Sequence, residues 1–300
     1  MYATKVADRV YVLDTYALGH PRAVGAYAIT GPKAMLVDCG YASSYQNVLA
    51  GLTEVGILPS DVRYIVPTHV HLDHAGAAGH LVKEMPNAKV VAHEKSVPHL
   101  ADPTKLVQSA TRVFGEAIMG LYGSPEPIPP DRMTAVGKEL HMDLGDGLTA
   151  TLIHTPGHAP HQVSVMLDGT KNLLTADAVG IVYPGMKTLI PTTPPPSFDP
   201  NQLVSTVHSL RQLGAIRLLT PHFGAKADVD HIFASTEEKV TRWVKDVGDM
   251  KGRGTSLDEA AEAMQLRVQR EAGVGELPVY AKVSIRVSVM GIMHYLSKNV

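Results

Sequence analysis

Hydrophobic and polar positions alternate over short stretches in the first 40 residues, which is typical of β-strands with one buried face. Turn residues such as Gly31 and Pro32 separate these stretches. The pattern predicts an antiparallel meander with strands at Val10–Leu13, Gly25–Thr30 and Ala34–Asp38.

The pattern then changes to alternating helices and buried strands, which is typical of an α/β unit. Apolar residues recur at helical spacing in two segments, and each segment is followed by a short apolar run. The predicted order is helix Ser43–Val55, strand Val62–Val66, helix Ala75–Lys83 and strand Ala88–Ala92.

Residues Glu94–Arg132 begin with an apolar stripe at helical spacing and end in the loop YGSPEPIPPD, so we expect an insertion that covers a site. Beyond it, DGLT and DGTK are hairpin signals between apolar runs, which indicates a second sheet. Its predicted strands are Lys138–Asp143, Leu148–His154, Gln162–Leu167 and Leu173–Thr175.

Six prolines fall within the 18 residues Tyr183–Pro200, too many for a helix or a central strand, and this predicts a stiff surface loop. Ser256 and Glu259 form a capping-box pattern before a further helix. After residue 278 the apolar residues fit both a strand and a helix, and we favour a helix. The other elements expected here are helix Asn201–Leu213, strand Arg217–Thr220 and helix Val229–Val247.

Composition narrows the class of protein. A chain of 300 residues with 45% hydrophobic residues can bury a sizeable core. The 27 basic and 29 acidic residues are spread without long runs, so we expect a small-molecule substrate rather than a nucleic acid. Cys39 is the only cysteine, the first residues lack a signal-peptide layout, and no apolar run is long enough to span a membrane. We therefore expect a cytoplasmic protein that is not inserted in a membrane.

Four potential metal ligands, His69, His71, Asp73 and His74, lie within six residues between a predicted strand and a predicted helix. On extended backbone, residues two positions apart point the same way, so His69 and His71 form one pair, and Asp73 and His74 follow after the chain turns. This His-x-His-x-Asp-His pattern occurs by chance only about once in several hundred chains of this composition. It indicates a metal centre.

The motif resembles that of the metallo-β-lactamase superfamily, and the resemblance covers residues 8 to 225. It implies three further ligands, which the segments TPGHAPHQ, LLTADAV and LLTPHFG supply as His158, Asp177 and His222. By position, one metal ion goes to His69, His71 and His158, the other to Asp73, His74 and His222, and Asp177 bridges both. Asp73 and Asp177 are then the catalytic carboxylates. Asp38, which ends a predicted strand, supports the metal-binding loop without binding metal.

The resemblance also implies the cofactors and the fold. We expect two divalent metal ions, with zinc preferred and iron or manganese as alternatives. A hydroxide that bridges the two ions would be the nucleophile. The expected fold is α/β (α+β), a four-layer αββα sandwich over residues 1–227 with a helical extension at 228–300 packed on it. The apolar stripe near the end of the chain is compatible with a homodimer contact.

Other polar side chains receive weaker assignments. Tyr183, Lys187 and Tyr122 are candidates for the substrate pocket, although a surface Tyr or Lys is more often simply solvated. His154 and His161 flank His158 but lack its position after glycine, so they are not assigned as ligands. We expect structural or solvated roles for the remaining candidates, His93, His99, His141, His208, His231 and His294.

Departures from known subfamilies narrow the reaction. The bridging Asp177 argues against true β-lactamases and favours lactone, thioester and phosphodiester hydrolases. Lactonases of the superfamily usually have a tyrosine three residues after this aspartate, where Gly180 stands here, and Tyr183 could substitute. The alternative is an iron-dependent sulfur dioxygenase, which the absence of a Gly-Cys-Gly-Arg-like stretch disfavours. A nuclease and a non-catalytic member are the remaining alternatives, and the presence of all seven ligands disfavours the latter. We expect a hydrolase of ester-like bonds, with room for broad specificity.

Overall fold

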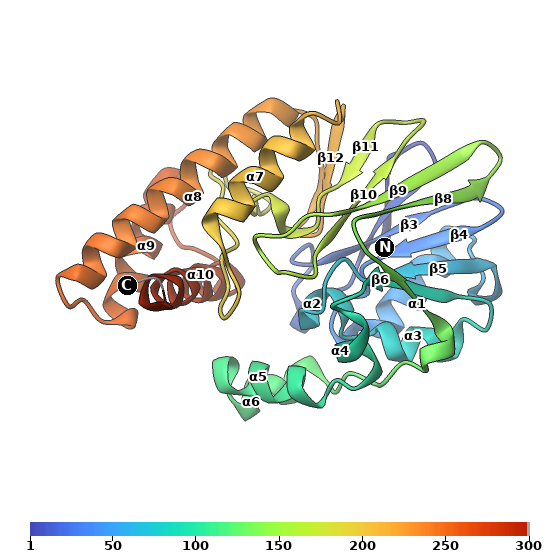
Figure 1. Cartoon of the computed structure of the whole chain (residues 1–300), viewed down its shortest axis with the longest axis horizontal. Coiled ribbons are helices and arrows are strands. Elements are labelled where there is room, and N and C mark those ends of the chain that lie inside the picture. Colours follow the sequence, from blue (N-terminus) through green and yellow to red (C-terminus); the bar gives the residue numbers. More distant parts are fainter. Residues whose placement is uncertain (299–300) are drawn as a thin grey trace. The chain divides into compact units, whose positions relative to one another are not determined.

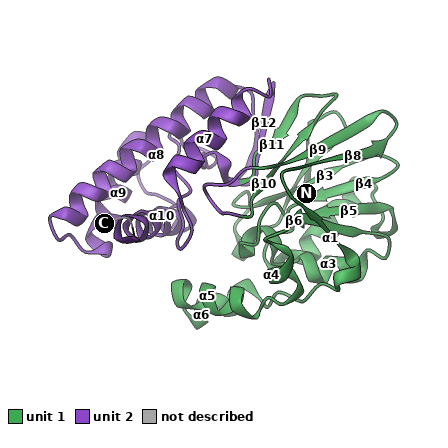
Figure 2. Cartoon of the chain, viewed as in Figure 1, with its two compact units in different colours: residues 1–154, 161–176 green, residues 155–160, 177–300 purple. Residues whose placement is uncertain are grey.

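The computed structural model describes residues 1–298, which group into two compact units (Figure 2). Unit 1 comprises Met1–His154 and His161–Ala176, and unit 2 comprises Thr155–Pro160 and Asp177–Val300. The short segment 155–160 therefore leaves unit 1 between two of its strands and belongs to the second unit. The expected division at residues 227 and 228 stays a prediction.

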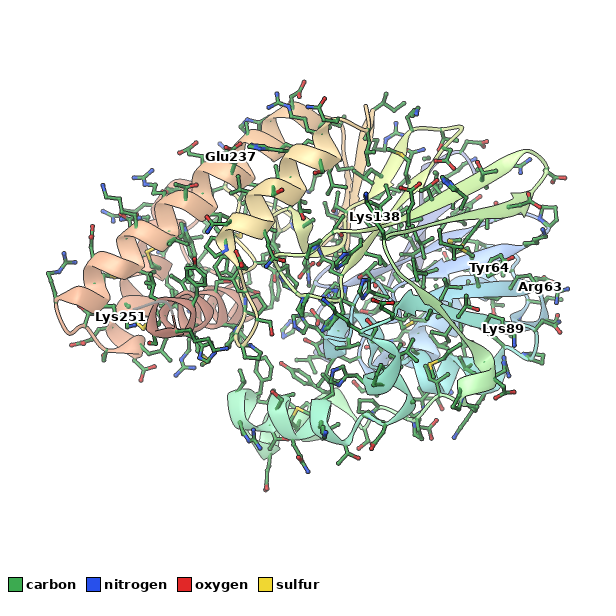
Figure 3. The ribbon with its side chains drawn as sticks, viewed as in Figure 1. Arg63, Tyr64, Lys89, Lys138, Glu237 and Lys251 are labelled. Atoms are coloured by element: carbon green, nitrogen blue, oxygen red, sulfur yellow. The ribbon has the colours of Figure 1, made fainter. Side chains whose placement is uncertain are left out.

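The first sheet of unit 1 has seven strands in chain order. The pairs from β1 to β4 are antiparallel and those from β4 to β7 are parallel, which confirms the predicted meander and the α/β unit after it. Tyr64 of β5 and Lys89 of β6, labelled in Figure 3, are partners in one of the parallel pairs. The strands are β1 (Ala3–Ala7), β2 (Val10–Asp14), β3 (Gly25–Ile29), β4 (Ala34–Val37), β5 (Val62–Val66), β6 (Lys89–His93) and β7 (Met133–Val136).

Helices cover this sheet and complete a hydrophobic core. Helices α1 (Tyr45–Glu54) and α3 (Ala78–Glu84) lie beside the strands in Figure 1. Leu52 and Leu81 from these helices join Leu36 and Ile65 from the strands in one buried cluster. The two outermost strands, β1 and β7, are absent from the sequence prediction because most of their residues are at least partly exposed and show no apolar alternation.

The second sheet of unit 1 confirms the predicted hairpins. Its antiparallel strands are β8 (Glu139–Gly145), β9 (Leu148–His154), β10 (Val163–Leu167) and β11 (Asn172–Leu174). A backbone hydrogen bond from the Lys33 N–H to the Leu144 carbonyl, 3.1 Å long, joins the loop between β3 and β4 to strand β8 of the second sheet. The segment predicted as a helical insertion forms α4 (Val97–Ala101), α5 (Thr104–Phe114) and α6 (Glu116–Tyr122).

Unit 2 is mainly helical. Its helices are α7 (Pro200–Arg211), α8 (Val229–Gly252), α9 (Leu257–Ala272) and α10 (Val279–Lys298), and β12 (Arg217–Thr220) pairs with β13 (Gly224–Lys226). Trp243 is 1% exposed at the centre of a core that α8, α9 and α10 share. The capping box at Ser256 and the helical final segment are both confirmed. None of the described helices is long and apolar enough to cross a membrane.

The proline-rich segment Tyr183–Pro200 differs from its prediction. It has no regular structure over most of its length, as predicted, but it is not a surface loop, because residues 188–193 are all buried. Ile181 and Ile190 form an antiparallel bridge, and Ile190, Met186 and Phe198 belong to the core of unit 2. Prolines remove backbone donors, and α10 supplies partners for several of the polar groups that remain, so this irregular chain can be buried.

Candidate metal centre

The loop between β5 and the short helix α2 (Leu72–Ala75) brings four predicted ligands together in unit 1. We call His69, His71, Asp73 and His74 the first cluster. His69 and His74 are fully buried, whereas His71 and Asp73 are partly exposed. The Nε2 atom of His69 lies 2.9 Å from the Nδ1 atom of His71. These two ring nitrogens therefore converge on one point, as ligands of a common ion do.

Asp38, directly after β4, fixes the position of this loop. One oxygen of its carboxylate accepts hydrogen bonds from the Thr68 N–H (2.8 Å) and the Thr68 hydroxyl (2.7 Å), and the other accepts one from His74 Nδ1 (2.9 Å). Asp38 has a positive φ of 59°, a left-handed conformation that aspartate tolerates better than most residues. The carboxylate thus links the end of β4 to the loop that carries the first cluster, and its supporting role stays a prediction.

These contacts indicate which nitrogen of each ring carries the proton. An ionised carboxylate only accepts hydrogen bonds, so His74 carries its proton on Nδ1 and presents the Nε2 lone pair. The Thr68 hydroxyl donates to Asp38, so at 3.1 Å it accepts from His69 Nδ1, and His69 also presents Nε2. Two nitrogen lone pairs as close as those of His69 and His71 repel unless a proton or a cation lies between them. The donor set therefore fits a cation.

Unit 2 holds the other three predicted ligands, His158, Asp177 and His222, which we call the second cluster. All three are at least 94% buried. One carboxylate oxygen of Asp177 lies 3.6 Å from His158 Nε2, and the other lies 3.6 Å from His222 Nε2. Each oxygen therefore faces a different imidazole, which is the arrangement of a carboxylate that bridges two cations.

Neutral groups hold the second cluster. The backbone carbonyl of Thr192 accepts a hydrogen bond from His158 Nδ1 at 3.0 Å, so His158 presents the Nε2 lone pair. The Thr192 hydroxyl donates to the backbone carbonyl of Asp177 at 2.9 Å. Gly157, with φ 130°, precedes His158, and a Cβ there would overlap the backbone of Leu203 in α7. A glycine is thus required for this close approach.

The three predicted pocket residues have different surroundings. Tyr122 ends α6, is buried, and stacks on Tyr41 with ring centroids 4.2 Å apart. Burial, together with the negative charge of Asp73, raises the pKa of Tyr122. The ring of Tyr183 lies 6.2 Å from that of His222, and its hydroxyl bonds Ser284 Oγ of α10 at 2.8 Å. Lys187 is exposed on the proline-rich segment.

Other histidines of unit 1 have ring contacts. The ring centroid of His161 is 6.3 Å from those of both His69 and His71. His161 therefore lies near the first cluster, although it is not one of the predicted ligands. His93 stacks on His154 with centroids 4.0 Å apart, and burial lowers the pKa of His93 to about 4, helped by His154. Cys39 is fully buried, and burial raises the pKa of its thiol, so it stays neutral.

Two threonines that sequence reasoning missed shape these clusters. Thr68 is next to the histidine motif but carries no signal of its own, because a threonine after a strand is ordinary. Thr192 lies in the proline-rich segment, 34 residues from His158, and nothing local connects the two. The histidine and aspartate side chains of both clusters are among those that could hold a metal ion. Nitrogen and carboxylate donors of this kind suit divalent zinc, iron or manganese.

Comparison with known proteins shows the family of the chain. A family model described as the metallo-beta-lactamase superfamily matches residues 21–222. A metallo-beta-lactamase fold-containing protein of Sulfurisphaera tokodaii is 32% identical over 58% of this chain and 63% of its own length. The N-acyl homoserine lactonase AttM of Azorhizobium caulinodans is 28% identical over 62% of this chain and 64% of its own. The chain therefore spans slightly less than two thirds of these curated relatives.

Solved structures give the same fold. The crystal structure of an archaeal metallo-beta-lactamase superfamily protein from Sulfolobus tokodaii aligns with a TM-score of 0.67 at 25% identity, over 91% of this chain and 93% of that one. A metallo-beta-lactamase family protein from Thermus thermophilus aligns with a TM-score of 0.69 at 19% identity, over 98% of this chain and 94% of that one. The predicted fold class, mixed sheets with helices and further helices toward the end of the chain, is thus confirmed.

Proposed function

The chain belongs to the metallo-β-lactamase superfamily, and from that premise we propose that it is a metal-dependent hydrolase whose two clusters together bind two metal ions and cleave an ester-like bond. One observation carries the proposal. The two oxygens of Asp177 face two different imidazoles, each at 3.6 Å. A carboxylate arranged in this way can serve two cations at once, whereas a site for one ion has no use for the second contact.

The proposed ligand sets follow the family pattern. His69, His71 and His158 bind one ion, Asp73, His74 and His222 bind the other, and Asp177 bridges them. The hydrogen bonds of Asp38 and Thr192 support this assignment, because they fix the protons of His74 and His158 on Nδ1 and leave Nε2 for the metal. We propose zinc as the metal, since imidazole and carboxylate ligands bind it at about 2.0 to 2.2 Å and leave positions open for water.

When bound, two such ions supply a hydroxide nucleophile at neutral pH and an electrophile for the substrate oxygen. The chain's own residues then position the substrate. Tyr122 keeps its proton, because burial and Asp73 raise its pKa, so its hydroxyl can donate a hydrogen bond beside the first cluster. Tyr183 places an aromatic ring beside His222 and is the candidate for a second wall of the substrate pocket.

We propose a lactone as the first substrate class to test, followed by a thioester and a phosphodiester. Support comes from the similarity to the AttM lactonase, whose name gives N-acyl homoserine lactone as its substrate. Gly180 stands where such lactonases have tyrosine, and a side chain there would overlap Leu189, so this position takes no larger residue without a shift. Tyr183 is the tyrosine that could take over the role of contacting the substrate.

The test pairs metal analysis with hydrolysis. Purified protein is expected to contain about two zinc ions per chain and to open an N-acyl homoserine lactone. In Asp177→Asn, zinc content should fall and kcat/KM should drop on the order of 10²-fold or more, because a charged ligand of both ions is lost. Asp168→Asn is the matched control, since Asp168 also accepts hydrogen bonds, from Thr149 and Thr151, but outside either cluster.

The outcomes separate the alternatives. Bound iron with consumption of oxygen and no hydrolysis would place the chain with the sulfur dioxygenases instead. If the purified protein binds no divalent metal ion, the proposal is wrong. The small-molecule substrate is part of this proposal, and the cytoplasmic location and the homodimer expected from the sequence stay predictions.

A further inference from the structure

Helix α10 and the proline-rich segment share a set of buried hydrogen bonds. The Ser288 hydroxyl donates to the Pro191 carbonyl at 2.7 Å and accepts from the Thr193 N–H at 3.4 Å. The Thr193 hydroxyl in turn donates to the backbone carbonyl of Ser288 at 2.9 Å. Ser288 is 3% exposed and Thr193 is fully buried, so water does not compete for these groups.

Gly291, one turn farther along α10, lets the segment approach the helix backbone. A Cβ at this position would overlap the carbonyl oxygen of Thr193 and would lie 2.6 Å from the carbonyl carbon of Pro194. Glycine in a helix interior costs roughly 0.5 to 1 kcal/mol relative to alanine. Here it permits a contact between backbones that no other residue allows without a shift of the segment.

The residue between these anchors is Thr192, which contacts two members of the second cluster. Its carbonyl accepts from His158 Nδ1 and its hydroxyl donates to the Asp177 carbonyl, at 3.0 and 2.9 Å. Pro191 and Thr193, its chain neighbours on either side, are the residues that α10 holds. Displacing them must move Thr192, because adjacent Cα atoms are fixed at about 3.8 Å across a trans peptide.

We infer that Ser288 and Gly291 of α10 are positioning residues for the metal ion that His158 and Asp177 bind. This inference rests on the proposed function, since it takes both side chains to be metal ligands. Neither Ser288 nor Gly291 touches a ligand; they act through Thr192, which sets the orientation of the imidazole and the place of the carboxylate. The helix thus supports the metal centre from outside it, through Thr192.

Outer partners of metal ligands typically change metal affinity by about 10- to 100-fold when they are removed. In Ser288→Ala, the Pro191 carbonyl and the Thr193 N–H lose a buried partner, and we expect zinc to leave about 10-fold faster. In Gly291→Ala, the new methyl group pushes the segment away from the helix, and we expect a loss toward the upper end of that range.

The experiment measures the rate at which zinc-loaded protein releases zinc to a chromogenic chelator, well below the unfolding temperature. The absorption bands of the cobalt-substituted protein provide a second readout, which reports the geometry around the metal. Ser297→Ala is the matched control for Ser288→Ala, because the Ser297 hydroxyl lies on the same helix and, among residues 1–298, bonds only Met293 and Lys251. Gly248→Ala is the control for Gly291→Ala, because a Cβ there meets only Leu296, at an ordinary 3.5 Å.

Faster zinc release and shifted cobalt bands in Ser288→Ala and Gly291→Ala, with both controls like the parent protein, would support the inference. If Gly291→Ala does not fold, Ser288→Ala decides alone. If the parent protein binds two zinc ions and Ser288→Ala releases them at the parent rate with unchanged cobalt bands, the inference is wrong and the proposed function stands. If the parent protein binds no metal, the proposed function itself has failed.

Discussion

The two clusters reach similar ligand orientations by different means. In the first cluster, four proposed ligands lie within six residues, and a carboxylate, Asp38, holds their loop through Thr68 and His74. In the second cluster, the proposed ligands are spread from residue 158 to residue 222, and the neutral carbonyl and hydroxyl of Thr192 align two of them, His158 and Asp177. The first cluster is therefore a local motif with an ionic support, and the second is a product of tertiary structure.

The two kinds of support also differ in the free energy that their removal costs. Hydrogen bonds to an ionised carboxylate are roughly twice as strong as those between neutral groups. Asp38 is 2% exposed and accepts three such bonds, so its removal leaves three buried donors without an acceptor and out of reach of water. Loss of one of the two neutral hydrogen bonds at Thr192 leaves fewer and weaker partners unsatisfied, so it costs less free energy. We expect damage to the support of the first cluster to reduce both stability and metal binding, and damage to the second to change mainly metal binding.

The largest expected effect is that of Asp38→Ala. The Thr68 N–H, the Thr68 hydroxyl and His74 Nδ1 lose their acceptor, at about 1 kcal/mol or more each, so the free energy of unfolding should fall by about 3 kcal/mol or more. Urea unfolding of the metal-free protein measures this loss, and metal titration should show the zinc affinity falling with it.

Asp168→Ala is the control for this substitution. Asp168 also accepts bonds from threonine hydroxyls, at 2.9 Å, but it is partly exposed, so water can replace it and we expect a loss of about 1 kcal/mol or less. Equal losses in the two variants would mean that the buried carboxylate of Asp38 has no special role in unit 1.

The difference between the two clusters also explains which of their residues could be predicted from the sequence. The spacing of His69, His71, Asp73 and His74 is visible in the chain, because a strand end and a helix start hold them without help from distant residues. His158, Asp177 and His222 are isolated residues, and only the resemblance to a family selected them. Thr192 and Ser288 could not be found, because their contacts join positions 15 to 97 residues apart.

The same limit applies to the fold. Buried strands and amphipathic helices were predicted well, since periodicity reports burial directly. Edge strands such as β1 lack that signal, and the proline-rich segment was wrongly placed at the surface because many prolines indicate irregular chain but not exposure. Whether an irregular segment is buried depends on partners for its polar groups, and here α10 supplies them from about 100 residues away.

The next expected effect depends on pH and lies in unit 1. Burial lowers the pKa of His93 from 6.5 to about 4, so between these values the unfolded chain binds a proton at this position and the folded protein does not. Stability should therefore fall as pH falls from 6.5 toward 4. His93→Phe keeps an aromatic ring against His154 but cannot titrate, so the metal-free variant should lose less stability over this range.

Urea unfolding across this pH range measures the difference between the two proteins. His141→Phe is the control, because the His141 side chain is 75% exposed, and this variant should follow the parent protein. If His93→Phe loses stability on acidification as steeply as the parent protein, the acid sensitivity of unit 1 has another source.

The smallest expected effect tests whether any damage to the helices of unit 2 disturbs the second cluster, or only damage that passes through Thr192. Ser256 caps α9 by accepting from the Glu259 N–H, and within residues 1–298 no hydrogen bond links Ser256 to the proline-rich segment. Ser256→Ala should cost about 1 kcal/mol of stability, the usual value of a helix cap, and leave the rate of zinc release unchanged. Urea unfolding and zinc transfer to a chelator measure the two quantities on one preparation. A large increase in the rate of zinc release would mean that the second cluster responds to the stability of unit 2 as a whole, and the specific path from α10 through Thr192 would lose its support.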